Sequence, residues 1–324
     1  MKSYLTPRSL GSKLYVLFSG ICMGAADVVP GVSGGTMAFI LGVYEDLLEA
    51  IHRFDVRLIR DVCQRRFREA FGRIPWQFLI LLVGGIAASV FALAETIEHL
   101  YENEQVLLFA FFFGLIVASV RVLAGGVAWN AARFGCLAVG ILVGWLMVTL
   151  TPNAMPQTVP VLFFSGAVAI MAMILPGISG SFLLLILGQY LWVMSQIRAI
   201  RQALSALEFA EVFRLGLGLL PLALGAVFGL LSFARLLRWI LQRRHNAMVA
   251  VLIGFMIGSL RKIWPWREPT LIEIIDDKPV VLADRLSPPG EQMLPALGLM
   301  LLGVVLILGL EAFQRRKAAA SPLV

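Results

Sequence analysis

The stretch Asp27-Val28-Val29-Pro30-Gly31-Val32-Ser33-Gly34-Gly35-Thr36 lies between two apolar runs and decides how the chain folds. It disfavours a continuous helix, because its proline lacks a backbone donor and its glycines adopt backbone angles that other residues resist. The chain repeats the pattern at Pro176-Gly177-Ile178-Ser179-Gly180-Ser181. The residues that follow also match at an offset of 146, where Ile40-Leu41-Gly42-Val43-Tyr44 corresponds to Ile186-Leu187-Gly188-Gln189-Tyr190. We therefore predict one structural unit built twice.

The composition is that of a membrane protein. Of the 324 residues, 59% are hydrophobic and 15% are charged, and the mean hydropathy is +0.87. A soluble domain carries about a quarter charged residues, and several runs here approach the roughly 20 apolar residues that span a bilayer. We therefore predict an all-α polytopic membrane protein. In a membrane protein the positions of the basic residues between the spans indicate orientation, so the net charge of +7 is interpreted in this way. It predicts no nucleic-acid partner.

Each half of the chain is predicted to hold a helical hairpin and three spanning helices. In the first half, residues 13–150, the hairpin arms are 13–29 and 36–51 around a first tip at 30–35, and the spans are 76–95, 105–120 and 134–150. In the second half, residues 159–312, the arms are 159–175 and 182–197 around a second tip at 176–181, and the spans are 215–234, 247–260 and 295–312. Each arm is about 16 residues, or about 24 Å of helix, so the hairpins are either re-entrant or barely spanning.

A second internal match lies outside the hairpins. The segment Ala110–Arg121 aligns with Ala250–Arg261 at an offset of 140, and alanine, glycine, serine and arginine recur in register. Apolar segments often align by chance, but chance seldom places glycine, serine and arginine together. This match therefore supports an internal duplication of the whole unit.

The basic residues predict the orientation in the membrane. A lead at 1–12 and a tail at 313–324 fall on the same side as residues 52–75, which carry seven arginines and are predicted to lie on the surface as an amphipathic helix. If this side is cytoplasmic, 19 of the 27 Lys and Arg residues lie inside and 8 outside, as the positive-inside rule favours. A hairpin returns to the side from which it enters, so a hairpin and three spans cross the membrane an odd number of times. The second half is therefore predicted to be inverted, as in secondary transporters. Residues 262–294 are predicted to form an outside loop.

The two tips are candidates for binding an anion. A Pro-Gly-x-Ser-Gly turn leaves the amides at the start of the following half-helix unpaired by that helix. Together with hydroxyl groups and the positive end of the helix dipole, these donors would form a phosphate or oxyanion cradle. The predicted binding residues are Gly31, Ser33, Gly34, Gly35, Thr36, Gly177, Ser179, Gly180 and Ser181. The alternative is that the glycines only permit close packing of helices.

Four charged residues are further candidates. Asp27 precedes the first tip within an apolar run, where a carboxylate is costly, and it is predicted to couple transport to a proton or sodium ion. A helix cap or an ion pair is the alternative role for this residue. Glu45 is a second candidate for ion coupling. Arg121 and Arg261 end equivalent spans and are predicted to receive a phosphate at opposite faces, or else to snorkel to the interface.

No metal, cofactor or catalytic residue is predicted. The histidines and cysteines show no metal-ligand spacing, and the three cysteines include no CxxC pair. The sequence also contains no Walker loop, GxSxG elbow or HExxH motif. These observations disfavour the common hydrolase and metalloenzyme classes.

The residues Gly24–Thr36, followed by Gly42-Val43-Tyr44-Glu45, resemble the signature of the DUF368 membrane proteins, and Pro176–Ser181 resembles that family's second motif. The resemblance extends over residues 12–312. It implies a transporter that returns undecaprenyl phosphate, the polyprenyl-phosphate carrier of cell-wall synthesis, from the outer to the inner leaflet of the bacterial cytoplasmic membrane. Its partners would then be the polyprenyl-phosphate lipid and the surrounding membrane lipids, and its mechanism alternating access with proton or sodium coupling left open.

Two other functions fit parts of the pattern. Undecaprenyl-pyrophosphate phosphatases resemble this chain in a Pro-Gly-x-Ser tip, but they follow it with an arginine and supply a glutamate cluster, where this chain has Gly34-Gly35 and Gly180-Ser181. Phosphoryl transfer needs positioned charge around the phosphorus, so an enzyme is disfavoured. An anion channel or small-solute symporter fits the architecture alone. Sensitivity to the lipid tail would separate such a protein from a lipid translocase.

Overall fold

The computed structural model describes residues 4–7, 9–29, 32–150, 155–275, 278–290 and 292–319 of the chain. Within these ranges the protein is mostly helical, and five helices are long and apolar enough to span a membrane, or six if one bent pair counts as a span. The five spanning stretches are Trp76–Leu93, Gln105–Ala124, Ala131–Thr149, Phe209–Ile263 and Met293–Ala312. The prediction of a multi-pass membrane protein is confirmed.

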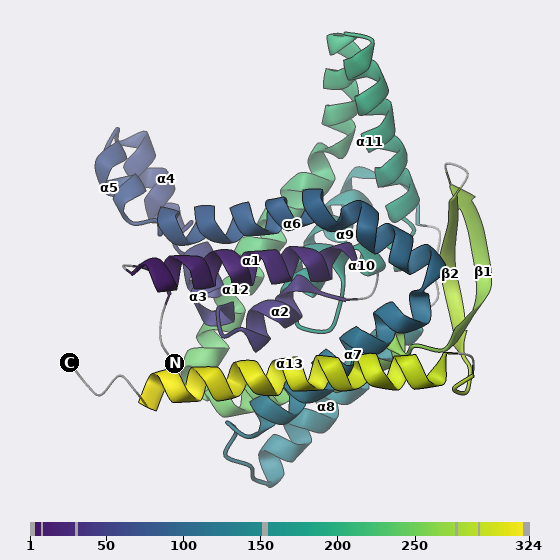
Figure 1. Ribbon diagram of the computed structural model, residues 1–324. Coiled ribbons are helices and arrows are strands. Elements are labelled where there is room, and N and C mark those ends of the chain that lie inside the picture. The colour runs from purple at the N-terminus through teal and green to yellow at the C-terminus, as the bar shows by residue number, and fades with distance from the viewer. Residues whose placement is uncertain are drawn as a thin grey trace.

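The two halves begin alike, with a long helix, a seven-residue helix and a third helix, and then differ in the elements that follow (Figure 1). The first half holds α1 (Leu10–Val28), α2 (Gly34–Ile40), α3 (Tyr44–His52), α4 (Val56–Cys63), α5 (Phe67–Gly72), α6 (Trp76–Asn103), α7 (Gln105–Ala124) and α8 (Ala131–Thr149). The second half holds α9 (Val159–Ile174), α10 (Gly180–Ile186), α11 (Tyr190–Ser205), α12 (Phe209–Ser259), a 3₁₀ turn at Leu260–Ile263, strands β1 (Arg267–Ile275) and β2 (Lys278–Leu286), and α13 (Met293–Ala319).

Several helices begin at local start signals in the sequence. A capping box formed by Ser9 and Ser12 opens α1. The side chain of Asn130 accepts a hydrogen bond from the amide of Arg133 and caps α8. A proline in the first turn opens α9, where its missing amide donor costs nothing.

Each hairpin is broken twice, where the sequence predicted one tip and a continuous second arm. The arms expected at 36–51 and 182–197 are interrupted at Gly42 and Gly188, whose φ angles are +70° and +66°. This region of backbone space is open to glycine and strained for residues with a Cβ. The bend between α10 and α11 reaches 110°. The seven-residue helices α2 and α10 therefore stand at the same offset of 146 and end at the same kind of turn.

Glycines bring the hairpins against their neighbouring spans in both halves. Gly20 of α1 faces Gly85 of α6, and a Cβ on either glycine would overlap the backbone of the other helix. In the second half, Gly166 of α9 and Gly225 of α12 meet the backbone of the facing helix in the same way. Small residues at these positions permit the close backbone approach that drives helix association in lipid. The two seams lie at matching positions of the internal repeat.

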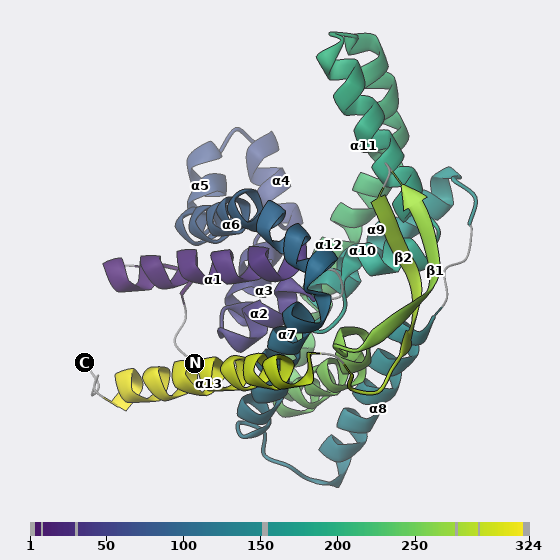
Figure 2. The same ribbon diagram turned by 45° about the vertical axis from the view of Figure 1, so that its right-hand side comes forward.

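The two halves are also packed into each other. Gly114 of α7 faces Gly303 of α13, and Gly140 of α8 faces Gly254 of α12. Each of these two seams therefore joins a helix of the first half to a helix of the second. Figures 1 and 2 both show α7 crossing α13 obliquely and α11 projecting from the bundle beside the start of α12. The core surrounds α2, of which residues 34–39 are all buried. The first tip therefore leads directly into the centre of the protein.

The structure differs from the sequence predictions in four segments. Residues 96–103 are helical and extend α6, and residues 235–246, expected as a loop, lie within the 51-residue α12, which is kinked at Arg244. Residues 52–75 hold the two short helices α4 and α5 instead of one amphipathic helix. The expected loop at 262–294 contains the antiparallel hairpin β1–β2, so the protein is not entirely α-helical. Its strands are rich in isoleucine, leucine and valine, which favour pleated structure.

Long-range side-chain contacts join segments that lie far apart in the sequence. Glu49 forms an ion pair with Arg238, and His245 Nε2 lies 3.0 Å from Glu45 Oε1. At the other end of the bundle, Gln292 donates a hydrogen bond of 2.9 Å to the carboxylate of Glu104. The inversion of the second half and the orientation of the termini stay predictions.

Candidate functional site

The first tip is held together by hydrogen bonds from its own residues. The residues Pro30 and Gly31 lie outside the described residues. The Ser33 hydroxyl accepts a hydrogen bond of 3.2 Å from the Gly35 amide and caps α2. The Asp27 carboxylate accepts one of 2.7 Å from the Gly34 amide. A Cβ on Gly34 would lie 2.5 Å from that carboxylate, so glycine is required here for Asp27 to reach the helix start.

The two tips meet at the centre of the molecule. The Gly177 amide donates a buried hydrogen bond of 2.7 Å to Thr36 Oγ1, across 141 positions of sequence. The Ser33 hydroxyl lies 3.4 Å from the carbonyl oxygen of Met173, near the end of α9. A Cβ on Gly35 would lie 2.8 Å from the same carbonyl. The structure thus brings together predicted binding residues from both halves.

The second tip is more open than the first. Gly177 has a φ of +94°, and a Cβ there would lie 2.5 Å from the Ser259 hydroxyl. The hydroxyls of Ser179 and Ser181 lie 2.8 Å apart and are exposed. Among the described residues, no side chain caps the start of α10. The position equivalent to Asp27 is Met173, so the carboxylate that holds the first tip has no counterpart in the second.

The other predicted charged residues do not join the tips. Arg121 is exposed in the last turn of α7, and Arg261 is exposed within the 3₁₀ turn. Their side chains form no hydrogen bond or ion pair with a tip residue in the part of the chain that the structure describes. Glu45 lies in the first turn of α3, beside His245. Their roles in phosphate binding and ion coupling stay predictions.

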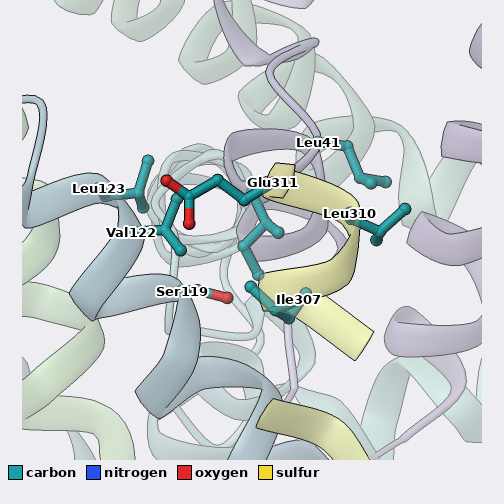
Figure 3. Close-up of a pocket in the computed structure, with 8 residues that line it drawn as sticks. Leu41, Ser119, Val122, Leu123, Ile307, Leu310 and Glu311 are labelled. Atoms are coloured by element: carbon teal, nitrogen blue, oxygen red, sulfur yellow. The ribbon is translucent and has the colours of Figure 1, made fainter. Parts of the chain in front are cut away.

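Two cavities border the hairpins. One, of about 40 Å³, lies between the ends of α2 and α7 and the second half of α13, with the Glu311 carboxylate pointing along it toward Leu123 (Figure 3). This volume suits about one water molecule, and the acidic side chain disfavours an anion. The other, of about 270 Å³, is an apolar groove along α9. It is lined by Met155, Pro160, Val161, Phe164, Ser165, Val168 and Leu187. An apolar groove suits hydrocarbon and not a charged group.

Sequence reasoning missed the groups that surround the second tip. Ser259 touches Gly177, and three residues later Lys262 places its ammonium 4.8 Å from the ring centre of Phe182, the residue after Ser181. Lys262 lies at the start of the segment 262–294, where mixed charges in a proline-containing stretch gave no readable pattern. Among the described residues, no group of three or more His, Cys, Asp or Glu could hold a metal ion.

Comparison with known proteins gives the family. Residues 23–278 match the family model VCA0040-like, described as undecaprenyl phosphate translocase-like. A protein of Vibrio cholerae named polyprenyl-phosphate transporter is 38% identical over 314 residues, covering 94% of this chain and 97% of that protein. A Staphylococcus aureus protein of the same name is 29% identical over 267 residues, covering 77% and 85%. No solved structure matches the chain. The extent of the family match and of the similarity to the Vibrio cholerae protein shows that the chain belongs to the VCA0040-like family of undecaprenyl phosphate translocase-like proteins.

Proposed function

We propose that this protein transports polyprenyl phosphate across the bacterial cytoplasmic membrane and carries out no covalent chemistry. The phosphate head passes from the outer to the inner leaflet, where the carrier re-enters cell-wall synthesis, while the prenyl tail stays in lipid. Family membership and the names of the two relatives support this substrate class. The observation that carries the proposal is the buried hydrogen bond between Gly177 and Thr36, because it joins the two tips into one polar centre.

A polar centre is what a lipid phosphate needs in order to cross. An ionised group in hydrocarbon is costly unless hydrogen bonds or charges compensate it. The backbone amides and hydroxyls at the tips would supply these partners without an opposite full charge that would trap the anion. The second tip, with its exposed Ser179 and Ser181 hydroxyls, would receive the head first. The first tip would receive it next, and alternating access of the inverted halves would release it inside.

Asp27 is proposed to couple this movement to an ion. Its carboxylate occupies the Gly34 amide, which is one of the donors that a phosphate oxygen would use. A bound proton or cation would weaken this charge-assisted hydrogen bond and free the amide for the substrate. The substrate and the Asp27 carboxylate would therefore compete for one donor. Glu45, which lies beside His245, is a second candidate for coupling on the cytoplasmic side.

The test is a reconstitution assay in proteoliposomes. Movement of undecaprenyl phosphate between leaflets would be measured together with phosphate release from undecaprenyl pyrophosphate. The test variant is Ser179→Ala/Ser181→Ala, which removes two exposed hydroxyls from the second tip. The matched control is Ser195→Ala/Ser205→Ala, which removes two hydroxyls that bond only to the backbone of α11 itself.

We expect the wild type and the control to move the lipid without releasing phosphate, and the test variant to lose at least about tenfold in rate, as for the loss of hydrogen bonds to a charged group. Phosphate release would instead identify an enzyme. Transport of inorganic anions with no dependence on the prenyl tail would identify a channel or symporter. Equal rates in the test and control variants would place the binding site away from the second tip.

A further inference from the structure

A partly buried cluster of two cations and one anion lies beside the second tip. Asp284 of β2 accepts hydrogen bonds through one oxygen, Oδ2, from Arg267 of β1 at 2.8 Å and from Lys262 at 3.2 Å. The exposed fractions of the three side chains are 6% for Arg267, 16% for Lys262 and 19% for Asp284. The cluster thus lies between the 3₁₀ turn that ends α12 and the β hairpin.

The cluster adjoins the helix that starts at the second tip. The Lys262 ammonium lies over the ring of Phe182, in the first turn of α10. The 3₁₀ turn that holds Lys262 also borders the second tip, because Ser259, the residue before this turn, stands against Gly177. An anion held between the two cations would therefore lie next to the tip, on the side of the β hairpin. Among the described residues, Asp284 is the one carboxylate that forms an ion pair with either cation.

The positive charge of the cluster exceeds its negative charge. Buried charges are normally paired, yet two cations here share one carboxylate. The Nε–H of Arg267 is buried and has no hydrogen-bond partner in the part of the chain that the structure describes. The guanidinium carbon lies 4.2 Å from the ring centre of Phe109, which holds the group in place. Burial lowers the pKa of this guanidinium, and the neighbouring Asp284 opposes the shift.

We propose that Lys262, Arg267 and Asp284 form a second anion site, which takes the phosphate monoester of the substrate before it reaches the tips. That the phosphate belongs to a lipid rests on the proposed function. A guanidinium with a free N–H beside an ammonium is a combination suited to phosphate oxygens. Asp284 acts as the internal anion that holds both cations when the site is empty, so it competes with the ligand.

The experiment measures binding to the purified full chain in a phosphate-free detergent and buffer by titration calorimetry. The probes are inorganic phosphate and farnesyl phosphate, which share the phosphate and differ in the tail. The variants are Lys262→Gln, which removes a cation, and Asp284→Asn, which removes the competing carboxylate. The control is Arg285→Gln, an equal change of charge at an exposed neighbour of Asp284 whose side chain points to the other face of β2.

The two test variants should change affinity in opposite directions. We expect Lys262→Gln to weaken binding of both probes at least about tenfold, as for the loss of a charge-assisted hydrogen bond. Asp284→Asn should strengthen it, and Arg285→Gln should leave it within about twofold, because exposed charges contribute little. Tighter binding of farnesyl phosphate would show that the tail adds to recognition by the same site, and equal binding that the site recognises the phosphate alone.

A purely structural role as a clamp on the β hairpin gives a different result. In that case Asp284→Asn would lower the unfolding temperature without strengthening binding, and this outcome would overturn the proposal. If Lys262→Gln fails to fold, Lys262→Arg keeps the charge and should keep the binding. Asp284→Asn still tests whether removal of the carboxylate strengthens binding. Failure of the proposed function looks different: wild type would move no lipid in liposomes and yet bind phosphate in a way that depends on Lys262.

Discussion

The contact between Thr36 and Gly177 allows a quantitative prediction. Thr36 is 1% exposed, and its hydroxyl oxygen accepts the hydrogen bond of the Gly177 amide. Thr36→Val keeps the shape of the side chain but leaves a buried amide without an acceptor, which costs about 1–3 kcal/mol. Thr36→Ser keeps the acceptor and loses one buried methyl, at a cost of about 1 kcal/mol. Both variants should lower the free energy of unfolding, and Thr36→Val should also separate the tips.

The two variants are distinguished by measuring stability and transport together. Unfolding would be followed by tryptophan fluorescence in SDS titrations, and lipid movement in the liposome assay. We expect Thr36→Ser to transport at a rate near that of the wild type and Thr36→Val to lose at least about tenfold, which corresponds to about 1.4 kcal/mol. A Thr36→Val protein within about 0.5 kcal/mol of the wild type in stability, the range of a surface substitution, and with normal transport would refute this reasoning.

Three further predictions concern Asp27, the turn after α10 and the seam between α7 and α13. Asp27→Asn keeps an oxygen for the Gly34 amide, so it should fold normally and lose the dependence of transport on a proton or sodium gradient; unchanged gradient dependence would exclude Asp27 as the coupling group. Gly188→Ala should lower the free energy of unfolding by about 1–2 kcal/mol because its φ is +66°; its control is Gly216→Ala, at a helical position with open space, which should not destabilise the protein. Gly114→Leu should greatly reduce the yield of folded protein, because its Cβ would overlap the backbone of α13, whereas Gly84→Leu, with open space around its Cβ, should not; equal yields of the two would argue against the packed seam.

Much of the local structure could be predicted from the sequence. Glycine and proline act on the backbone at their own positions, so the breaks at the two tips were visible without a fold. The spanning helices were visible as apolar runs, because the bilayer sets both their length and their composition. The offset of 146 also predicted that α2 and α10 would match. The turns at Gly42 and Gly188 were missed, although both glycines were in the aligned motif, because a glycine within an apolar run also fits a packed helix.

The site itself was predicted only in part. The serines, threonine and glycines of the tips were identified from their types, and Asp27 from its place in an apolar run. Their partners were not, since the hydrogen bond from Gly177 to Thr36 joins residues 141 positions apart. The shared use of Asp284 by Lys262 and Arg267 depends on a β hairpin that was expected to be an irregular loop.

By itself the sequence determined that the chain crosses a membrane, where its helices break and which residues are repeated. These properties depend on the preferences of single residues and on the solvent that surrounds them. Only the tertiary structure decided that the two tips meet, that Asp27 holds the start of α2, and that a cation pair lies beside the second tip. The physical reason is that many helix pairings bury similar apolar surface, and the close fit of glycines such as Gly114 and Gly303 selects among them.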